Sequence, residues 1–151
     1  MDEEKEVPHN LIAEEGLIAC CCLAEDSEGY DRISHLIEPS DFYFRRNEIL
    51  FHSVVNLGRN EEINEVSLME DLKRTSSLDD VGGVAGIFAI LERAETPTSL
   101  MYYAKLVKEK SKLRSIIRQC RIASEMAMSE SQDSALIQSN LESDMMSLAD
   151  E

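Results

Sequence analysis

The sequence of 151 residues contains no tryptophan, three prolines, four phenylalanines and four tyrosines. So few β-forming aromatics and turn-forming prolines argue against a turn-rich β-sandwich and favour helices. No stretch approaches the roughly 20 apolar residues that a membrane-spanning helix requires. Residues 1–7 are acidic and no apolar signal-peptide core follows them, which argues against secretion. We therefore expect a cytoplasmic, all-α protein.

Basic residues are also scarce, with 15 Lys plus Arg against 30 Asp plus Glu and a formal net charge of -15. Phosphate binding as the main task is disfavoured, because counterion release needs clustered cations. None of the 6 glycines is followed by lysine, so Gly82-Gly83 cannot begin the Gly-Lys-Ser/Thr end of a P-loop. At 43% hydrophobic and 30% charged residues, the chain is expected to fold into one domain with a buried core.

Cysteine and histidine show no metal-binding pattern. The cysteines are Cys20, Cys21, Cys22 and Cys120, and the histidines are His9, His35 and His52. Three consecutive positions on a helix point about 100° apart, so their thiols cannot converge on one metal. We interpret Cys20 and Cys120 as small apolar core residues in a reducing compartment, and we expect at least one of the three adjacent thiols to face water. A metal or redox enzyme built on the cysteines is therefore the least favoured interpretation. We expect no catalytic, cofactor-binding or metal-binding residue in this segment.

Apolar residues recur at helical spacing through the first 99 positions, after an acidic tail at residues 1–9. A short aromatic segment at 41–44 is interpreted as a loop held in the core, because only Arg45 and Arg46 could support base stacking there. Thr96-Pro97 ends this part with a helix breaker. The expected helices run from an N-cap at Asn10 to about residue 26, over 30–37, over 47–57, from Asn64 or a capping box at Ser67 through Leu72, and over 84–94.

The balance of charge changes after residue 99. Residues 1–99 hold 8 basic and 22 acidic side chains, residues 100–128 hold 7 and 2, and residues 129–151 hold 0 and 6, so the local balances are -14, +5 and -6. The basic stretch has the pattern of one long amphipathic helix. Four of its cations line one side, namely Lys110, Arg114, Arg118 and Arg121.

After a polar break at 129–134, the pattern predicts a second helix and hence a helical hairpin over 100–151. The apolar positions that we assign to a dimer interface are Leu113, Ile116, Ile117 and Cys120 on the first arm and Ile137, Leu141, Met145 and Leu148 on the second. Two helices of this length cannot bury both stripes alone, so they favour pairing with a second copy. The alternatives are that both arms fold back onto residues 1–99, or that the basic arm binds DNA, which its acidic neighbour disfavours.

Several short segments together resemble a known family. They are, in order, Pro8-His9-Asn10, Ala13-Glu14, Asp41-Phe42-Tyr43, Ile49-Leu50-Phe51, Ser67-Leu68, Leu78, Val81-Gly82-Gly83, Thr96-Pro97 and Tyr103-Ala104-Lys105-Leu106-Val107. Their order and spacing are similar to those of the N-terminal domain of DnaB-type replicative DNA helicases, over about residues 7–150. Two segments depart from the family pattern: Cys20-Cys21-Cys22, where small residues or leucine are usual, and Thr75 to Ser77, where glycine is frequent.

The resemblance implies a helical head at 10–99 and a hairpin at 100–151 through which protomers pair into a collar on a hexameric ring. It implies a linker and a RecA-like ATPase domain absent from this chain, which would bind ATP and Mg²⁺ and contact single-stranded DNA. It also implies docking of the primase C-terminal domain and of a helicase loader during DNA replication. The leading hypothesis is thus a non-catalytic collar domain of an ATP-dependent DNA helicase. The rival hypothesis is a free-standing acidic helical adaptor dimer unconnected to a motor.

Overall fold

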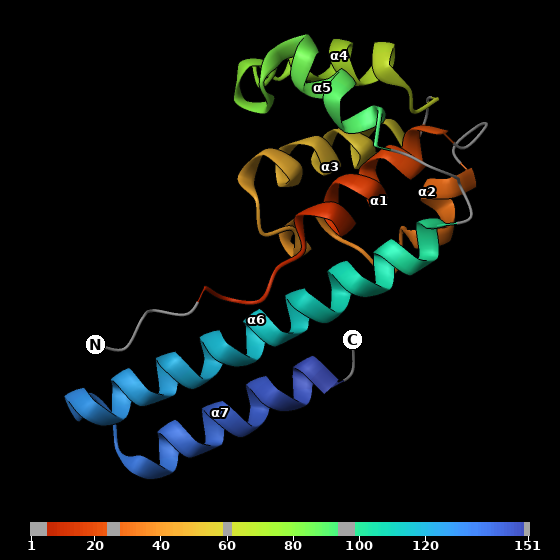
Figure 1. Cartoon of the computed structure of the whole chain (residues 1–151). Coiled ribbons are helices and arrows are strands. Elements are labelled where there is room, and N and C mark those ends of the chain that lie inside the picture. The colour runs from red at the N-terminus through yellow and green to blue at the C-terminus, as the bar shows by residue number, and fades with distance from the viewer. Residues whose placement is uncertain (1–5, 24–27, 59–61, 94–98, 150–151) are drawn as a thin grey trace. The chain divides into compact units, whose positions relative to one another are not determined.

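The computed structural model describes residues 6–23, 28–58, 62–93 and 99–149, and within these ranges it contains helices and no strand (Figure 1). This confirms the all-α class. None of the described helices combines the length and the apolar character needed to cross a membrane. The elements are α1 (Leu11–Leu23), α2 (Glu28–Ile33), η1 (Pro39–Asp41), α3 (Arg45–Gly58), α4 (Glu65–Arg74), η2 (Asp79–Val81), α5 (Gly83–Leu91), α6 (Leu100–Ser129) and α7 (Ser134–Ala149).

The chain divides into two compact units. Residues 9–109 form one unit, which we call the head, and residues 1–8 with 110–151 form the other, which we call the hairpin unit. Helix α6 supplies residues to both, and within the head its first turns bury Leu100, Ala104 and Val107. Residues 100–109, which the charge pattern assigned to the hairpin, therefore belong to the head.

Helix α1 is the centre of the head, where it contacts α2, α3 and α5. Every residue from Ala13 to Cys21 is buried, so this helix has no solvent-facing side over most of its length. Gly16 lies where the ring of Tyr103 passes, and a Cβ there would stand 2.7 Å from Tyr103 Cε2. The absent side chain thus allows the start of α6 to approach α1.

Two adjacent carboxylates, Glu14 and Glu15, lie in this buried stretch, each 2% exposed. Glu14 accepts hydrogen bonds from the backbone N–H groups of Tyr43 (2.9 Å) and Phe44 (3.4 Å), and from Asn47 Nδ2 (3.1 Å). These donors lie at the start of α3, where backbone N–H groups have no partner inside the helix. A side chain of α1 therefore satisfies the N-terminus of α3.

Glu15 is held by two arginines from other elements. Its Oε1 lies 2.8 Å from Arg46 Nη2 in α3, and its Oε2 lies 2.9 Å from Arg93 Nη1, just after α5. A buried carboxylate is strongly unfavourable unless it is paired. The two ion pairs therefore compensate its burial and join α1 to both neighbours.

Helix caps explain several boundaries. Asn10 Oδ1 accepts from the N–H of Ala13 at 3.0 Å, as expected for the cap of α1. The cap of α4 is Asn64 rather than a box beginning at Ser67: Asn64 Oδ1 accepts from Ser67 N, and Ser67 Oγ accepts from Asn64 N, both at 2.9 Å. The side chains of Asn64 and Ser67 each bond the backbone N–H of the other residue. This reciprocal cap therefore begins at Asn64, three residues before the alternative box that would begin at Ser67.

The bounds of two helices, α2 and α5, differ clearly from those that the pattern predicts. The helix expected over 30–37 is α2 and ends at Ile33, where the N–H groups of Leu36 and Ile37 both reach the Ile33 carbonyl, at 2.9 and 3.0 Å. The helix expected over 84–94 begins one residue earlier and ends at Leu91. The breaker at residues 96–97 lies outside the described residues. Many of the apolar residues that recur at helical spacing in the head are buried, among them Ile33, Ile37, Leu50, Val54, Leu57, Leu68, Leu72, Val81, Ile87 and Ile90.

The aromatic segment after η1 is only partly held in the core. Phe42 is 4% exposed and its ring centroid lies 4.8 Å from that of Phe51. Tyr43 remains 41% exposed and stacks on His9 at 4.4 Å with an interplanar angle of 12°. The first ring anchors the loop, whereas the second covers the entry to α1.

The cysteines divide into buried and exposed. Cys20 and Cys21 are buried and Cys22 is half-buried, so none of the three adjacent thiols is exposed. The core assignment of Cys20 is confirmed, but that of Cys120 is wrong within this chain, because Cys120 is exposed on α6. Burial raises the pKa of Cys21 well above its ordinary value and that of Cys22 to about 12, with smaller contributions from the neighbouring thiols and, for Cys22, from Glu65. These thiols are therefore protonated at neutral pH and chemically inert.

We predict that Glu14→Gln destabilises the head by about 2–4 kcal/mol, because the amide would place donor hydrogens against groups that are themselves donors. Urea unfolding followed by far-ultraviolet circular dichroism measures the change. Glu48→Gln is the matched control, since Glu48 is 35% exposed, pairs with Arg45 and should cost about 0–1 kcal/mol. Equal losses for the two variants would contradict the role assigned to Glu14.

Candidate oligomerisation surface

The hairpin consists of α6 and α7, which run antiparallel beside each other (Figure 1). The turn between them passes through Glu130, whose φ is 52°. Asp133 then caps α7, its Oδ1 accepting from the N–H of Leu136 at 2.8 Å. An acceptor side chain in the polar break thus starts the second arm.

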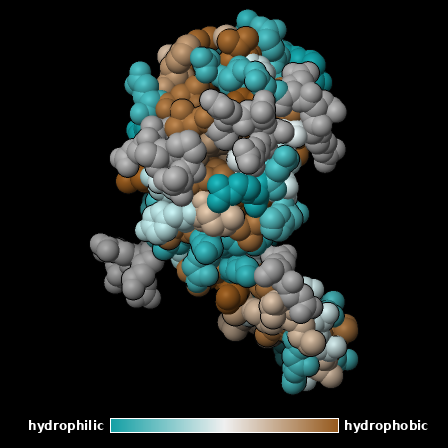
Figure 2. All heavy atoms as spheres, turned by 90° about the vertical axis from the view of Figure 1, so that its right-hand side faces the viewer, coloured by the Kyte–Doolittle hydropathy of each residue, from teal (hydrophilic) through white to brown (hydrophobic). Residues whose placement is uncertain are grey.

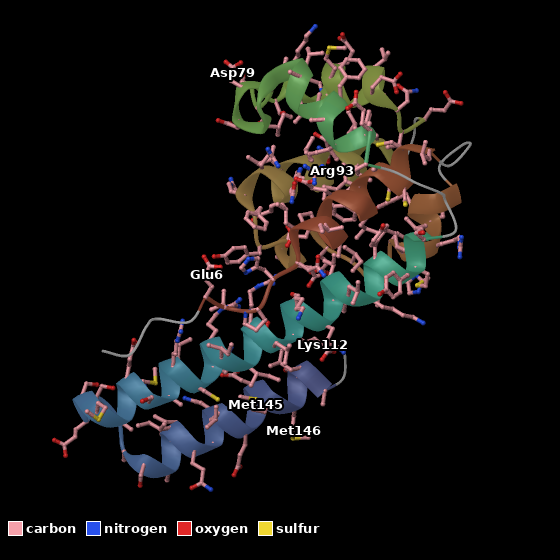
Figure 3. All side chains as sticks on the ribbon, in the orientation of Figure 1. Glu6, Asp79, Arg93, Lys112, Met145 and Met146 are labelled. Atoms are coloured by element: carbon pink, nitrogen blue, oxygen red, sulfur yellow. The ribbon has the colours of Figure 1, made fainter. Side chains whose placement is uncertain are left out.

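Helix α7 has a single protected face. Its four predicted interface residues are all half-buried, namely Ile137, Leu141, Met145 and Leu148, and none of its described residues is fully buried. In Figure 3, Met145 points toward α6, whereas Met146, which is 71% exposed, points away. The α7 stripe therefore faces α6 of the same chain.

Two cavities show which part of α6 receives this stripe. One, of about 200 Å³, and another, of about 560 Å³, are both lined by Ile137 and Leu141 of α7. On α6 the first cavity is lined by Gln119, Ile122, Ala123 and Met126. Both are clefts open to the surface beside the contact between the two arms.

Most of the α6 residues selected from the sequence lie on a different side of the helix from the cavity lining. At about 100° per residue, Leu113, Ile117 and Cys120 fall more than about 100° from the mean direction of the lining residues, whereas Ile116 lies on the same side as Gln119, Ala123 and Met126, at spacings of 3, 4 and 3. Leu113 and Ile117 are half-buried, Ile116 is 42% exposed and Cys120 is exposed. The sequence analysis missed Ile122, Ala123 and Met126, although Ala123 and Met126 continue the line of Ile116 at helical spacing. Helix α6 thus has one apolar side toward α7 and a second one that carries Leu113, Ile117 and Cys120.

Apolar side chains also reach the surface elsewhere in the hairpin unit. Met128 is 85% exposed, Leu136 46% and Ile122 41%. Figure 2 shows apolar surface atoms interspersed with hydrophilic ones. Whether the eight predicted residues form an interface between copies is a property of an assembly and stays a prediction.

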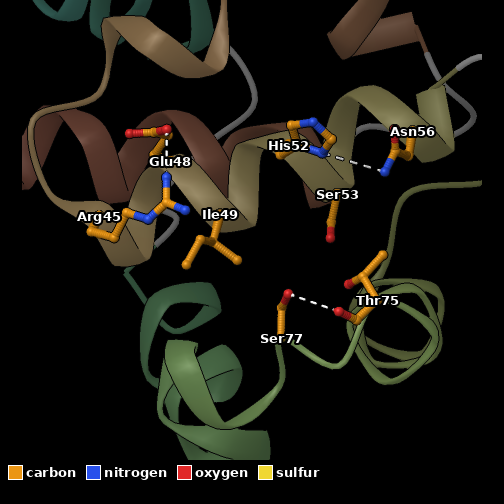
Figure 4. Close-up of a pocket in the computed structure, with 8 residues that line it drawn as sticks. All are labelled: Arg45, Glu48, Ile49, His52, Ser53, Asn56, Thr75 and Ser77. Atoms are coloured by element: carbon orange, nitrogen blue, oxygen red, sulfur yellow. Dashed lines mark hydrogen bonds and ion pairs between the residues drawn. The ribbon is translucent and has the colours of Figure 1, made fainter.

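A polar pocket of about 220 Å³ lies in the head between α3 and the turn after α4 (Figure 4). Its polar groups mostly pair with each other: Arg45 Nη1 lies 2.7 Å from Glu48 Oε1, Asn56 Nδ2 lies 3.4 Å from His52 Nδ1, and Ser77 Oγ donates to the Thr75 carbonyl at 3.3 Å. No base and nucleophile are paired among these residues, so the pocket lacks the arrangement of a hydrolytic site.

Asp71 lies behind this region and is 6% exposed. Burial by itself raises the pKa of the Asp71 carboxyl, but hydrogen bonds from Arg74, Ser53 and Asn56 outweigh it and hold the pKa below its ordinary value. Such a carboxylate stays ionised and serves the structure of α4. Within the described ranges, no group of three His, Cys, Asp or Glu side chains is placed to hold a metal ion.

The head matches the family model described as "DnaB-like helicase N terminal domain" over residues 6–109. Replicative DNA helicase DnaC of Bacillus subtilis is 31% identical over 112 residues, which are 74% of this chain and 24% of that protein. Replicative DNA helicase DnaB of Geobacillus stearothermophilus is 28% identical over 116 residues, 76% of this chain and 25% of that protein. The chain thus spans about a quarter of the length of these relatives.

A solved structure shows the same fold. The crystal structure of the N-terminal domain of DnaB helicase from Mycobacterium tuberculosis superposes with a TM-score of 0.85 at 20% identity, covering 95% of this chain and 99% of that one. Since the family model covers more than half of the sequence and the helical fold agrees, the chain belongs to the family of DnaB-like helicase N-terminal domains.

Proposed function

We propose that this domain is the oligomerisation collar of a hexameric, ATP-dependent replicative DNA helicase and docks the primase C-terminal domain and the helicase loader. Its role is architectural: pairing of hairpins fixes the arrangement of protomers and keeps motor domains at high effective concentration. Catalysis, ATP and Mg²⁺ binding and DNA translocation belong to a motor region of the parent protein. The relatives support this division, because the match covers about a quarter of each of them.

The observation that carries the proposal is the second apolar face of α6. Cys120 is exposed on it, and Leu113 and Ile117 are half-buried there. Full burial of a leucine or isoleucine contributes about 1.5–3 kcal/mol. Because Leu113 and Ile117 are already half-buried, association gains about half of that for each, and these two residues on each of two protomers contribute about 3–6 kcal/mol, comparable with the lower end of the roughly 4–15 kcal/mol cost of association.

The two arms contribute differently to the proposed interface. The eight residues of the interface are Leu113, Ile116, Ile117, Cys120, Ile137, Leu141, Met145 and Leu148. Of these, the α7 residues also hold the hairpin together, because Ile137 and Leu141 face α6. The α6 residues are therefore the better targets for separating protomers without opening the hairpin.

The rival function is an acidic adaptor dimer without a motor. Both functions need a paired hairpin, so pairing does not distinguish them. The gene does: a Gly-x-x-x-x-Gly-Lys-Ser/Thr sequence encoded in frame after residue 151 supports the helicase, and a stop codon at that point supports the adaptor.

We predict that Ile117→Asp with Cys120→Asp converts a dimer to a monomer, because two carboxylates per protomer cannot be desolvated in an apolar interface. Size-exclusion chromatography with light scattering measures the mass at one loading concentration. The matched control is Met128→Asp with Met146→Asp, which changes two exposed apolar side chains outside the assigned interface. An unchanged mass in the first variant, with native circular dichroism, would refute the interface.

Alkylation of Cys120 gives a second measurement of pairing. We expect its rate with iodoacetamide to fall as protein concentration rises, because the dimer covers the thiol. Cys20 and Cys21 serve as internal controls: burial raises the pKa of both, so at about pH 8 they remain protonated and react slowly at every concentration. Peptide mass spectrometry follows each site, and a Cys120 rate independent of concentration would contradict the assignment.

Primase docking is tested by calorimetric titration of the cognate primase C-terminal domain into the wild-type chain and the Ile117→Asp, Cys120→Asp variant. We expect binding to the wild type and an affinity about tenfold lower for the variant, a loss of about 1.4 kcal/mol, because paired hairpins organise the docking surface. Absence of binding to the folded wild type contradicts docking. Equal affinity shows that docking does not require pairing.

A further inference from the structure

The polar pocket of the head is formed by one face of α3 and by the turn that follows α4 (Figure 4). On the α3 side its lining includes Ile49, Ser53 and Asn56, which follow one another at spacings of 4 and 3 on one face of a helix. On the turn side the lining residues are Thr75 and Ser77. Figure 4 shows the Ser53 hydroxyl pointing toward the turn and the Ser77 hydroxyl pointing back toward α3. Hydroxyl groups from two different elements therefore face each other across the pocket.

The hydroxyl protons on the turn side are already used within the chain. Thr75 Oγ1 donates to the backbone carbonyls of Asp71 and Leu72, at 3.1 and 3.3 Å. Ser77 Oγ donates to the Thr75 carbonyl at 3.3 Å. A hydroxyl group has one proton and two acceptor lone pairs. Since both protons are directed at the backbone, these two oxygens can only accept hydrogen bonds from a molecule in the pocket.

The donors on the α3 side are used in the same way. Asn56 Nδ2 lies 3.4 Å from His52 Nδ1, and because an amide nitrogen only donates, the histidine nitrogen is the acceptor. His52 itself is exposed, so water satisfies its second ring nitrogen. Ser53 and Asn56 also direct hydrogens at the Asp71 carboxylate and lower its pKa, although not closely enough to give Oδ2 a hydrogen-bond partner. The α3 groups that remain available are again acceptors, namely the lone pairs of Ser53 and the carbonyl oxygen of Asn56.

The charges around the pocket add to this excess of acceptors. Glu48 lines the pocket and pairs with Arg45, and Asp71 behind it pairs with Arg74. In both pairs the arginine is the more exposed partner, at 76% and 67%, so water screens the positive charges more strongly than the negative ones. The turn side of the pocket also lies at the C-terminal end of α4, where the helix dipole favours a positive charge.

The size and the walls of the pocket select among positively charged molecules. Its volume of about 220 Å³ is below the roughly 300–1,000 Å³ of pockets that hold drug-sized ligands. The described ranges contain no group of three His, Cys, Asp or Glu side chains that could hold a metal ion. Ile49 supplies an apolar wall, against which the methylene groups of an alkyl chain can pack. A primary alkylammonium group, with three N–H donors on an apolar stem, meets all of these conditions.

We propose that this pocket binds a primary alkylammonium group, which is either a lysine side chain of a partner protein or a free aliphatic diamine. The ammonium group donates to the oxygens of Ser53, Thr75 and Ser77. Its apolar stem packs against Ile49, and Glu48 supplies the ionised carboxylate of the lining. The site belongs to the head and does not depend on the proposed pairing of hairpins.

Nuclear magnetic resonance titration of the full chain with n-butylammonium chloride tests the site. We expect saturable shifts, in the millimolar range, of the Asn56 side-chain amide and of the backbone amides of Thr75 and Ser77. Tetramethylammonium chloride is the control ligand, because it carries the same charge and has no N–H donor. Absence of saturable shifts with butylammonium, or equal shifts with tetramethylammonium, overturns the proposal.

Substitution of Glu48 tests the charge in the lining. Glu48→Gln should weaken butylammonium binding about three- to fivefold, because it removes one partly exposed carboxylate and keeps the size of the side chain. Glu70→Gln is the matched control: it makes the same change of net charge in the same unit, at a side chain that is 69% exposed and does not line this pocket. We expect its affinity to stay within about 1.5-fold of the wild type, because water and salt screen a charge outside the pocket. Equal weakening by both variants, each with native circular dichroism, overturns the site.

Two further ligands distinguish the sources of the ammonium group. A Gly-Lys-Gly peptide, blocked at both ends, presents the side chain of a partner protein, and putrescine presents a free diamine. Tighter binding of the peptide supports a lysine of a partner, and tighter binding of putrescine supports a free diamine. If neither ligand shifts the signals of Asn56, Thr75 and Ser77, the assignment to a primary ammonium group is overturned.

Discussion

A hairpin of two helices has one internal contact surface, and this hairpin carries more apolar side chains than that surface can bury. The α7 stripe faces the stretch of α6 around Ala123 and Met126, and clefts open to the surface beside that contact. The face of α6 that carries Leu113, Ile117 and Cys120 lies away from those clefts, and Cys120 is exposed on it. Apolar area left in water favours association. The unsatisfied face is thus the physical basis for treating the hairpin unit as an assembly element.

The head follows the opposite principle, because two adjacent buried carboxylates are paired with other elements of the head. Glu14 accepts hydrogen bonds at the start of α3, and Glu15 pairs with Arg46 and Arg93. Both carboxylates lie on the most buried helix, so their partners restrict how α3 and the end of α5 pack against α1. Polar groups that line the pocket of the head likewise pair with each other.

Positive and negative side chains are unevenly distributed within the hairpin unit. Most cations of the hairpin unit lie on one arm, and the tail that precedes Pro8 is acidic. The Arg114 contact with the Pro8 carbonyl brings the two together in one unit.

Helical class, the main amphipathic helices and the α7 stripe could be predicted from periodicity, because apolar spacing reports directly on the side that a helix buries. The cap at Asn10 was readable for the same local reason. Tertiary structure alone decided that Glu14 and Glu15 are buried, since their partners lie about 30 positions away. It also decided that Cys120 is exposed and that Ile122 and Met126 receive α7. A stripe shows that a helix has an apolar face, but only the packing of neighbouring elements determines which of two such faces is covered within the chain.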